Sequence, residues 1–352
     1  MTTEELSLKP YIIKLLQKSD LTADEVDAVF SVLVSGSADP AQAAALLTLL
    51  AVKGESVEEI YGFARALRSH AVRIAPRLSE PAMDPVGTGG DGLNTFNIST
   101  TSMFVIAAAG IPVAKHGNVG ITSKSGSADL LRELGIKIDL SAEKTAESIE
   151  KIGVGFMFAP LYHPSMKHIA PVRRNLPFRT VFNILGPLCN PAFAGRQVFG
   201  VFHRDLQEPI ASVLYKLGVE RALVVTGTVN QGAGYMDEIS PFGITYCIEV
   251  HKDKGLRKFE FDARDLGIAK CTLDDIRGGV PAENAQIALR VLGGKDRTAV
   301  RDVVCLNAGA GLYVAGRAKD MASGFTQAVE LIESGAALGV LERWRKFCDS
   351  AM

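Results

Sequence analysis

The stretch MDPVGTGGDGLNTFNISTTSMFVIAAAGIPVAKHG (residues 83–117) decides the fold class of this chain. A short apolar run leads into a glycine-rich loop, a helix-like segment begins at NIST, and a second short apolar run follows. Strand, helix and strand in this order are typical of two parallel strands joined by a crossover helix. The stretch therefore predicts an α/β fold.

The same alternation of short apolar runs and longer amphipathic segments continues along the chain. Further short apolar runs, the expected strands, lie at residues 136–140, 154–160, 196–202 and 222–227. A late strand or hairpin is expected at residues 255–267, and residues 281–347 return to helical patterns. We expect one large α/β domain over residues 76–352, with a mostly parallel central sheet.

The first 75 residues carry helical signals and no strand pattern. Two segments begin with a capping box, Thr22 with Glu25 and Ser56 with Glu59, and a third begins with an aspartate, Asp39, followed by proline. Residues 1–75 are therefore expected to form a small all-helical domain. A helical segment near residues 163–190 is expected to join this domain.

Length and composition narrow the class of protein. The chain has 352 residues, a net charge of −1, 47% hydrophobic residues and 22% charged residues, which is typical of a soluble globular enzyme. A near-neutral charge argues against a nucleic-acid binder. The five cysteines show no C-x-x-C spacing, and the longest apolar run, residues 43–52, is far too short to span a bilayer. We expect a cytoplasmic protein with reduced thiols and no membrane or nucleic-acid partner.

The glycine loop has the spacing G-x-G-x-x-G at Gly87, Gly89 and Gly92, which alone is a weak dinucleotide signal. A dinucleotide site also needs an acidic residue about 20 positions later for the ribose. No Asp or Glu occurs between Asp91 and Asp129, so the dinucleotide interpretation fails.

The acid-free segment, residues 92–128, indicates a different ligand. It contains two lysines, a histidine, several hydroxyl side chains and further glycines, and the segments NIST and SGSADLL each begin a helix. Amides at helix amino termini, hydroxyls and ammonium groups without carboxylates suit a polyanion, so we expect phosphate binding here. The alternative is a pair of ordinary loops between strands and helices, with routine Ser and Thr caps.

Two further motifs have both a functional and a structural interpretation. The adjacent acids Asp237 and Glu238 offer hard oxygen ligands for a divalent metal, which commonly accompanies a diphosphate, but a solvated acidic turn would look the same. Arg173 and Arg174 either clamp a substrate carboxylate or form surface ion pairs. His163 and His168 match no metal motif and are expected to be structural.

Several blocks together resemble the anthranilate phosphoribosyltransferase family, over nearly the whole chain and in the expected order. They are GTGGDGLNTFNIST, AKHGN, SKSGSAD, HPSMKHIAPVRR, FNILGPLCNPA and MDEIS, with ADPAQAAALLTLLAVKGESVEEI and NAGAGLYVAG at the two ends. The resemblance implies a fold shared with nucleoside phosphorylases, a homodimer formed through the helical part, and Mg²⁺-dependent transfer of phosphoribosyl from phosphoribosyl pyrophosphate (PRPP) to anthranilate, in tryptophan biosynthesis.

The resemblance also implies roles for individual residues. Around PRPP it places Gly87, Gly90, Asp91, Thr95, Asn97, Ser99, Thr100, Lys115, Ser123 and Ser127. At anthranilate it places Gly87, Asn118 and Arg173, and at Mg²⁺ it places Ser99, Asp237 and Glu238. It implies no general base, because the attacking amine is neutral and loses its proton late, so positioning and electrostatics carry the catalysis.

The chain departs from the family pattern at three places. They are VGIT at residues 119–122, NQGAGY at 230–235 and NLPFRT at 175–180. The first two lie beside the expected substrate site, so a phosphoribosyltransferase that acts on a modified aromatic acid remains an alternative. A nucleoside phosphorylase of the same fold and a non-catalytic nucleic-acid-binding relative are further alternatives. The acidic pair argues against both, and the phosphorylase S-G-R-G loop is missing.

Overall fold

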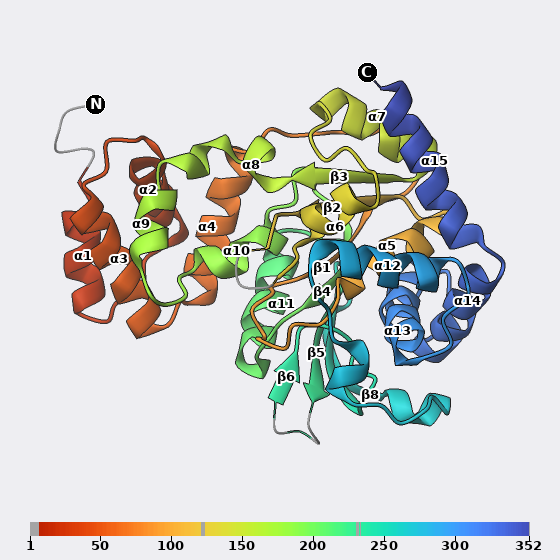
Figure 1. Cartoon of the computed structure of the whole chain (residues 1–352). Helices are drawn as coiled ribbons and strands as arrows, with labels where there is room; N and C mark the ends of the chain where they lie inside the picture. Colours follow the sequence, from red (N-terminus) through yellow and green to blue (C-terminus); the bar gives the residue numbers. More distant parts are fainter. Residues whose placement is uncertain (1–6, 121–123, 230–231, 233, 352) are drawn as a thin grey trace. The chain divides into compact units, whose positions relative to one another are not determined.

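The computed structural model describes residues 7–120, 124–229, 232 and 234–351. The chain forms two compact units: residues 1–73 together with 159–191, and residues 74–158 together with 192–352 (Figure 1). The excursion 159–191 leaves the second unit after one strand of its sheet and returns before the next.

The first unit is helical, as the sequence predicts. Both capping boxes form, with the Thr22 and Ser56 side chains accepting from the backbone amides of Glu25 and Glu59, and Asp39 caps the helix that begins at Pro40. These local hydrogen bonds satisfy amides that have no partner inside a helix, so they fix where each helix starts. The helices are α1 (Lys9–Leu16), α2 (Ala23–Val34), α3 (Pro40–Lys53), α4 (Val57–Ser69), α8 (Ala159–Tyr162), α9 (Ala170–Asn175) and α10 (Phe182–Leu188).

The second unit is built on one sheet, in which eight described strands follow the order β3-β2-β1-β4-β5-β7-β8, with β6 paired to β5. The neighbours from β3 to β5 are parallel, and β6, β7 and β8 are antiparallel additions. The predicted class, a helical domain plus an α/β domain with a mostly parallel central sheet, is confirmed. The strands are β1 (Met83–Gly87), β2 (Val113–Gly117), β3 (Val154–Phe158), β4 (Arg196–Gly200), β5 (Arg221–Val229), β6 (Gly234–Met236), β7 (Ile244–His251) and β8 (Gly255–Asp262).

One predicted strand is wrong. The run 136–140 forms no strand, although Ile136 and Ile138 are buried in the core. Alternating apolar residues bury one side of any extended segment, and here the segment packs on the core without pairing to a neighbour. The segment 255–267, expected to be a late strand or a hairpin, contains one strand, β8, and its antiparallel partner, β7, was not among the predicted strands.

Helices cover both faces of the sheet. Along β5, Leu223 and Val225 join a core with α5 and α13, while the intervening residues face the opposite side, where α11 packs on β5. Figure 1 shows α11 and α13 on opposite sides of β4 and β5. The helices of this unit are α5 (Ile98–Ala108), α6 (Ser127–Glu133), α7 (Ala142–Ile152), α11 (Gln207–Lys216), α12 (Pro281–Leu292), α13 (Ala299–Val314), α14 (Met321–Glu333) and α15 (Ala336–Ser350).

The strand order creates a natural binding edge. The chain runs from β1 outward to β3, then returns to β4 on the other side of β1, so the direction of winding reverses between β1 and β4. In open α/β sheets, ligands bind beyond the carboxyl ends of the strands at such a switch point. The loops that follow β1 and β2 both lie at that edge.

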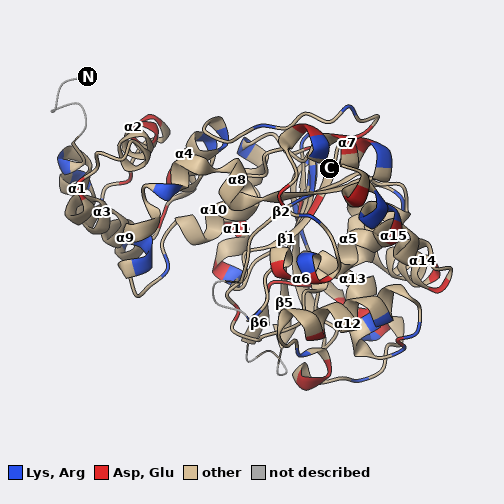
Figure 2. Ribbon diagram, turned by 45° about the horizontal axis from the view of Figure 1, so that its top comes forward, with Lys and Arg blue, Asp and Glu red and all other residues tan. Residues whose placement is uncertain are grey.

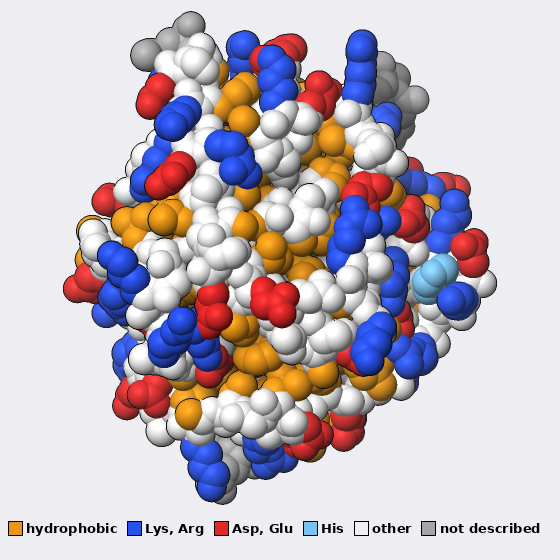
Figure 3. Space-filling model, turned by 90° about the vertical axis from the view of Figure 1, so that its right-hand side faces the viewer, with side chains coloured by type: hydrophobic (Ala, Val, Ile, Leu, Met, Phe, Trp, Pro, Cys, Tyr) orange, Lys and Arg blue, Asp and Glu red, His pale blue; other side chains and the backbone are white. Residues whose placement is uncertain are grey.

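Charged residues of both signs are interspersed over the helices (Figure 2), and on the face shown in Figure 3 charged side chains of both signs surround patches of hydrophobic ones. No helix among the described residues has the length and apolar character needed to cross a membrane.

Candidate active site at the carboxyl edge of the sheet

The site is built around the segment that carries Asp237 and Glu238, directly after β6. This segment passes so close to the carboxyl ends of β1 and β4 that neither strand can end in a residue with a side chain. A Cβ on Gly87 would lie 2.3 Å from Asp237 Oδ2, and one on Gly200 would lie 1.6 Å from the Asp237 carbonyl oxygen. The two glycines are partners in the β1–β4 register. Because they lack side chains, they let the backbone and side chain of Asp237 pack directly on the strand ends.

Backbone amides hold both carboxylates. The amide of Gly89, in the glycine loop, donates to Asp237 Oδ2 at 2.6 Å. The amide of Ser99, in the first turn of α5, donates to Glu238 Oε1 at 3.1 Å. The site thus joins the acidic pair to the glycine loop and to the amino end of α5. Both of these lie about 140 residues before the acidic pair along the chain.

The carboxylates crowd one another. Burial, followed by the nearby charge of Asp91, raises the pKa of Asp237 to about 7. Burial, followed by the charge of Asp237, raises the pKa of Glu238 well above its usual range. Acids held together in this way lack positive charge, which a cation would supply.

Lys115 is the base nearest to these acids. Its side chain is buried at the end of β2, and Nζ donates to the carbonyl of Pro85 at 2.5 Å and to Ser99 Oγ at 3.5 Å. Burial lowers its pKa, and the carboxyl groups of Asp84, Glu238 and Asp237 act in the opposite direction. A lysine held under the loop by a backbone carbonyl is positioned to meet an incoming anion.

The glycine loop depends on left-handed backbone at Gly89, Gly90 and Gly92, with φ of +68°, +79° and +75°. Side chains disfavour this region, so the glycines are needed for the path of the chain. Asp91 accepts from the Leu93 amide at 3.0 Å and stabilises the turn.

The loop after β2 folds back on its own backbone. The carbonyl of Asn118 accepts from Ser127 Oγ at 3.2 Å and from the Ala128 amide at 3.1 Å. Asp129 accepts from the amides of Gly120 and Gly126, so the first carboxylate after the acid-free segment turns towards that loop. Ser123, predicted to contact PRPP, lies outside the described residues, as do the last two residues of the VGIT departure.

Three predicted residues lie at or near the amino end of α5. Thr95 forms a bridge with Arg277, Thr100 is buried on α5, and Asn97 directly precedes the helix. Asn97 does not cap α5; its side chain bonds to Ser125, with Nδ2 donating to the Ser125 carbonyl at 3.0 Å and Oδ1 accepting from Ser125 Oγ at 3.1 Å.

Sequence reasoning missed two buried asparagines that support the site. Asn284 on α12 bonds to Asn97, and Asn307 on α13 accepts from the amide of Ile239, next to Glu238. A signal was present: Asn284 interrupts the apolar stripe of α12, whose other buried positions are Ala285, Ala288, Val291 and Leu292. A polar residue in such a stripe needs a hydrogen-bond partner.

Arg173 belongs to the helical unit, on α9, whereas Gly87 and Asn118 belong to the α/β unit. Its guanidinium lies over the Phe182 ring, 5.1 Å from the centroid, and burial lowers its pKa. No ion pair joins it to an acid within the described parts of the chain. An arginine held against an aromatic ring and left without a carboxylate is available for an anionic ligand.

Asp237, Glu238 and Ser99, which carry hard oxygen ligands, line one small cavity at the carboxyl edge. Across the described residues, no group of three His, Cys, Asp or Glu side chains makes a complete metal cage. Mg²⁺ does not require one, since it is commonly held by one or two carboxylates with substrate phosphates and water. The residues present therefore fit Mg²⁺ bound together with a phosphorylated substrate.

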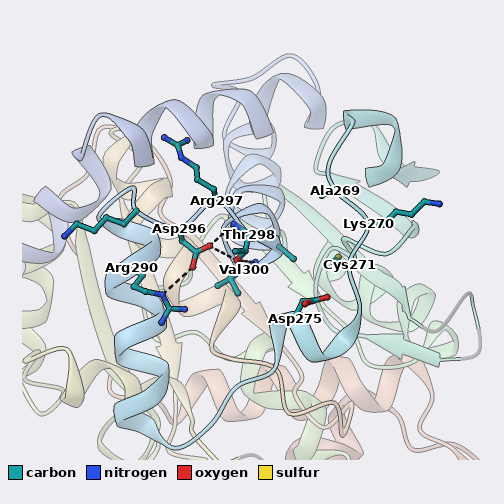
Figure 4. A pocket seen from close by; sticks show the side chains of 11 residues that line it. Ala269, Lys270, Cys271, Asp275, Arg290, Asp296, Arg297, Thr298 and Val300 are labelled. Carbon is teal, nitrogen blue, oxygen red and sulfur yellow. Dashed lines mark hydrogen bonds and ion pairs between the residues drawn. The ribbon is translucent and has the colours of Figure 1, made fainter.

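A separate pocket of about 630 Å³ lies between the segments 269–275 and 290–300 of the α/β unit. Figure 4 shows the side chains of Lys270, Arg290 and Arg297 pointing in different directions. Asp296 accepts from the amide and hydroxyl of Thr298, at 2.8 and 2.6 Å. Arg290 Nε lies 3.6 Å from Asp296 Oδ2, so this acid is paired with a base, unlike the acids of the carboxyl-edge site.

The chain is similar to known proteins along its whole length. Residues 9–71 match the helical bundle domain and residues 79–338 the a/b domain of the glycosyl transferase family. Anthranilate phosphoribosyltransferase from Persephonella marina is 47% identical over 97% of this chain and 98% of its own length. The crystal structure of the Thermus thermophilus enzyme superposes with a TM-score of 0.88 at 40% identity, over 96% of this chain and 99% of that one.

The Saccharomyces cerevisiae enzyme is also similar. Its structure in complex with PRPP and Mg superposes with a TM-score of 0.88 at 28% identity, and its structure in complex with 4-fluoroanthranilate with a TM-score of 0.87 at 27% identity. Each covers 98% of this chain and 99% of that one. With both domains matched and a relative 47% identical over nearly the full length, this chain belongs to the anthranilate phosphoribosyltransferase family.

Proposed function

We propose that this protein transfers the phosphoribosyl group of PRPP to the amine of anthranilate, giving N-(5-phosphoribosyl)anthranilate and pyrophosphate, a step of tryptophan biosynthesis. One observation carries the proposal. The acidic pair Asp237–Glu238 is seated against the glycine loop and beside buried Lys115, at the switch point of the sheet. A diphosphate with a divalent cation is the ligand that this combination suits.

The donor lies along the α/β unit in this proposal. The loop after β1, the amino end of α5 and the loop after β2 line the phosphates and ribose. The residues assigned to PRPP are Gly87, Gly90, Asp91, Thr95, Asn97, Ser99, Thr100, Lys115, Ser123 and Ser127. The Gly89 and Ser99 amides, which donate to the acidic pair, also set the distance between the metal ligands and the loop.

Ser99, Asp237 and Glu238 would hold Mg²⁺. When bound, the ion neutralises charge that develops on pyrophosphate as it leaves. The chain's own contribution is to fix the two carboxylates against backbone amides before the donor binds, so that little reorganisation is needed during the reaction.

The acceptor site is assigned to Gly87, Asn118 and Arg173. The carboxylate of anthranilate suits the guanidinium of Arg173, while Asn118 orients the aromatic amine. The amine attacks C1 of the ribose as the bond to pyrophosphate breaks, and it loses its proton late, so we assign no catalytic base. Alignment of the two substrates supplies most of the rate enhancement.

The first experiment follows the fluorescence of anthranilate in the presence of the protein, PRPP and Mg²⁺, with each component omitted in turn. Loss of fluorescence that needs both PRPP and Mg²⁺ is the expected result. If fluorescence is stable while calorimetry still detects PRPP binding, the donor half of the proposal holds and the acceptor is a different aromatic acid. If PRPP does not bind either, the proposal is wrong.

Arg173→Ala tests the acceptor assignment. We expect the KM for anthranilate to rise about 10- to 100-fold, the value of a charge-assisted pair, while the KM for PRPP stays within about twofold. Steady-state kinetics with each substrate varied in turn measures both constants. Arg174→Ala, the neighbouring arginine, is the matched control. An equal rise of KM for the two substrates would show that Arg173 is not part of the acceptor site.

We also propose that the protein is a cytoplasmic homodimer that associates through its helical unit. Exposed apolar side chains on the packed helices α1 and α3 support this: Leu16 is 64% and Val52 is 80% exposed. Sedimentation of wild type and of Leu16→Glu with Val52→Glu tests the interface. A wild-type dimer that the double variant converts to monomer is expected, and a wild-type monomer would overturn the assignment. The cysteines, all free and most of them buried, suit a reducing compartment.

A further inference from the structure

We propose that Asn284 of α12 is a positioning residue for the loop after β1, residues 88–97, which we call the PRPP loop, and that it acts through Asn97. The inference rests on the proposed function, because it concerns how the α/β unit holds the donor. It assigns a role in substrate binding to a helix that contributes none of the predicted site residues.

The contact itself is short and buried. Asn284 is 2% exposed, and its Nδ2 donates to Asn97 Oδ1 at 2.9 Å. Its Oδ1 accepts from the amide of Gly279 at 2.8 Å. The carboxamide therefore bridges the residue before α5 and the segment that leads into α12. Figure 1 shows α12 beside α5.

The segment 276–279 also contacts the end of the PRPP loop. Its hydrogen bonds add to the one between Asn284 and Asn97. The Phe96 amide donates to the carbonyl of Ile276 at 3.3 Å, and the Gly278 amide donates to the carbonyl of Asn94 at 2.8 Å. The approach is so close that a Cβ on Gly278 would lie 2.7 Å from the Thr95 carbonyl oxygen. The loop residues 94–97 are thus held by chain that comes almost 200 residues later.

The hydrogen bonds of Asn97 determine which residue type Asn284 must be. Asn97 Nδ2 donates to the Ser125 carbonyl, so its Oδ1 faces Asn284 and can only accept. The Gly279 amide can only donate. A side chain between them must donate on one side and accept on the other, and a carboxamide does both. Carboxylate or aliphatic replacements lose at least one bond in a buried place.

The bridge fixes the second end of the PRPP loop. At the first end, the Thr88 amide donates to the Gly200 carbonyl at 2.9 Å, and the Gly89 amide donates to Asp237. Between these anchors lie glycines with left-handed backbone, which give the loop freedom to move. Without Asn284, Asn97 and the start of α5 lose an anchor, and PRPP must order the loop when it binds.

The experiment measures PRPP binding by calorimetry with Mg²⁺ present, in Asn284→Ala and Asn284→Asp. Asn284→Ala loses both hydrogen bonds of the side chain, and the loss of the one to Asn97 predicts a Kd for PRPP about tenfold higher, with kcat within about twofold at saturating PRPP. Asn284→Asp keeps the volume and the acceptor for Gly279 but faces Asn97 Oδ1 with a second acceptor, so at least the same increase is expected. This variant also serves if the alanine variant fails to fold.

Two controls separate positioning from general loosening of the unit. Ser148→Ala removes a similarly buried hydrogen bond, from Ser148 Oγ to the carbonyl of Val154 at 2.6 Å, at the opposite edge of the sheet. Its Kd for PRPP should match that of the wild type. In an Asn97→Ala background, Asn284→Ala should add less than about twofold, because the residue through which it acts is already gone.

The outcomes distinguish this inference from the proposed function. If wild-type protein does not bind PRPP, the proposed function fails. If wild type binds PRPP and Asn284→Ala binds it equally well, or loses the same factor with and without Asn97, then Asn284 is a structural residue only and the inference is overturned.

Discussion

Two buried clusters of carboxylates, one in each unit, are handled in opposite ways. In the helical unit, Glu59 is fully buried and accepts from the amides of Leu21 and Ser56 at 2.9 and 2.7 Å. Lys53 donates to the same carboxylate at 2.8 Å and to Asp20 at 2.6 Å. The buried carboxylate of Glu59 is thus paired with a base inside the unit, and we call this the balanced cluster.

At the carboxyl edge of the α/β sheet, by contrast, Asp237 and Glu238 accept from backbone amides and form no ion pair among the described residues, so we call this the unbalanced cluster. Asp237, Glu238 and Asp91 lie close together, and Lys115 is the base that lies with them. Buried charge without a partner costs stability, so a chain retains it only where something else is gained. We infer that the balanced cluster holds the fold, whereas the unbalanced one is completed by a ligand.

The largest expected effect comes from neutralising the unbalanced cluster. We expect Asp237→Asn and Glu238→Gln each to lower kcat/KM by roughly 10³-fold, as for loss of a metal ligand that stabilises the leaving group. The free energy of unfolding should stay the same or rise, because a repelling charge is removed. Kinetics over a range of Mg²⁺ concentrations and urea unfolding measure the two quantities. A large fall in stability with activity retained would make the acidic pair structural and end the comparison.

The balanced cluster should respond in the opposite way. Glu59→Ala leaves the Leu21 and Ser56 amides and Lys53 without their shared acceptor, and removing one partner of a buried pair costs about 3 kcal/mol. Urea unfolding should show this loss, while the KM for each substrate in the folded fraction stays within about twofold. Lys144→Ala, which removes an exposed ion pair to Glu147, is the control and should leave unfolding unchanged.

The same contrast explains how far sequence reasoning reaches. Glu59 was predicted as the third residue of a capping box, because Ser56 lies three residues away and the bond is local. The acidic pair by itself fits either a metal site or a solvated turn, and the resemblance of MDEIS to the family is what indicates the metal. The contact between Asn284 and Asn97 spans 187 residues, and no local pattern specifies that approach. The strand predicted at residues 136–140 is wrong for a related reason. Whether an extended segment finds a neighbouring strand depends on the whole sheet and not on the local sequence.

A third buried titratable group, a histidine, is neutral at pH 7. His163 of the helical unit is buried, and its Nε2 lies 3.1 Å from the carbonyl of Cys189. The carbonyl only accepts, so Nε2 carries the proton of a neutral ring. Burial lowers the pKa of His163 to about 4, although the bond to the carbonyl acts in the other direction.

Because its folded pKa lies below the unfolded value, His163 contributes stability above about pH 6.5 and loses it as the pH falls towards 4. The free energy of unfolding should fall by about 2 kcal/mol between pH 7 and pH 5 through this residue. Urea unfolding at several pH values measures the slope. His163→Gln keeps a donor for the Cys189 carbonyl and should flatten the profile over this range. An equally steep profile in that variant would assign the dependence to other groups.

The smallest expected effect separates backbone shape from charge in the unbalanced site. Gly89 has φ of +68° and no atom within 4 Å of a Cβ built on it, so Gly89→Ala adds no clash and strains only the backbone. That strain costs about 1–2 kcal/mol, and the amide that donates to Asp237 shifts with it. We expect the KM for PRPP to rise several-fold while that for anthranilate is unchanged. Gly110→Ala, with φ of +79° and equally open space, carries the same strain at the end of α5 and should leave both constants unchanged. If the KM for PRPP is the same in the two variants, the left-handed backbone at Gly89 does not contribute to PRPP binding. The charges of the unbalanced cluster must then account for donor binding.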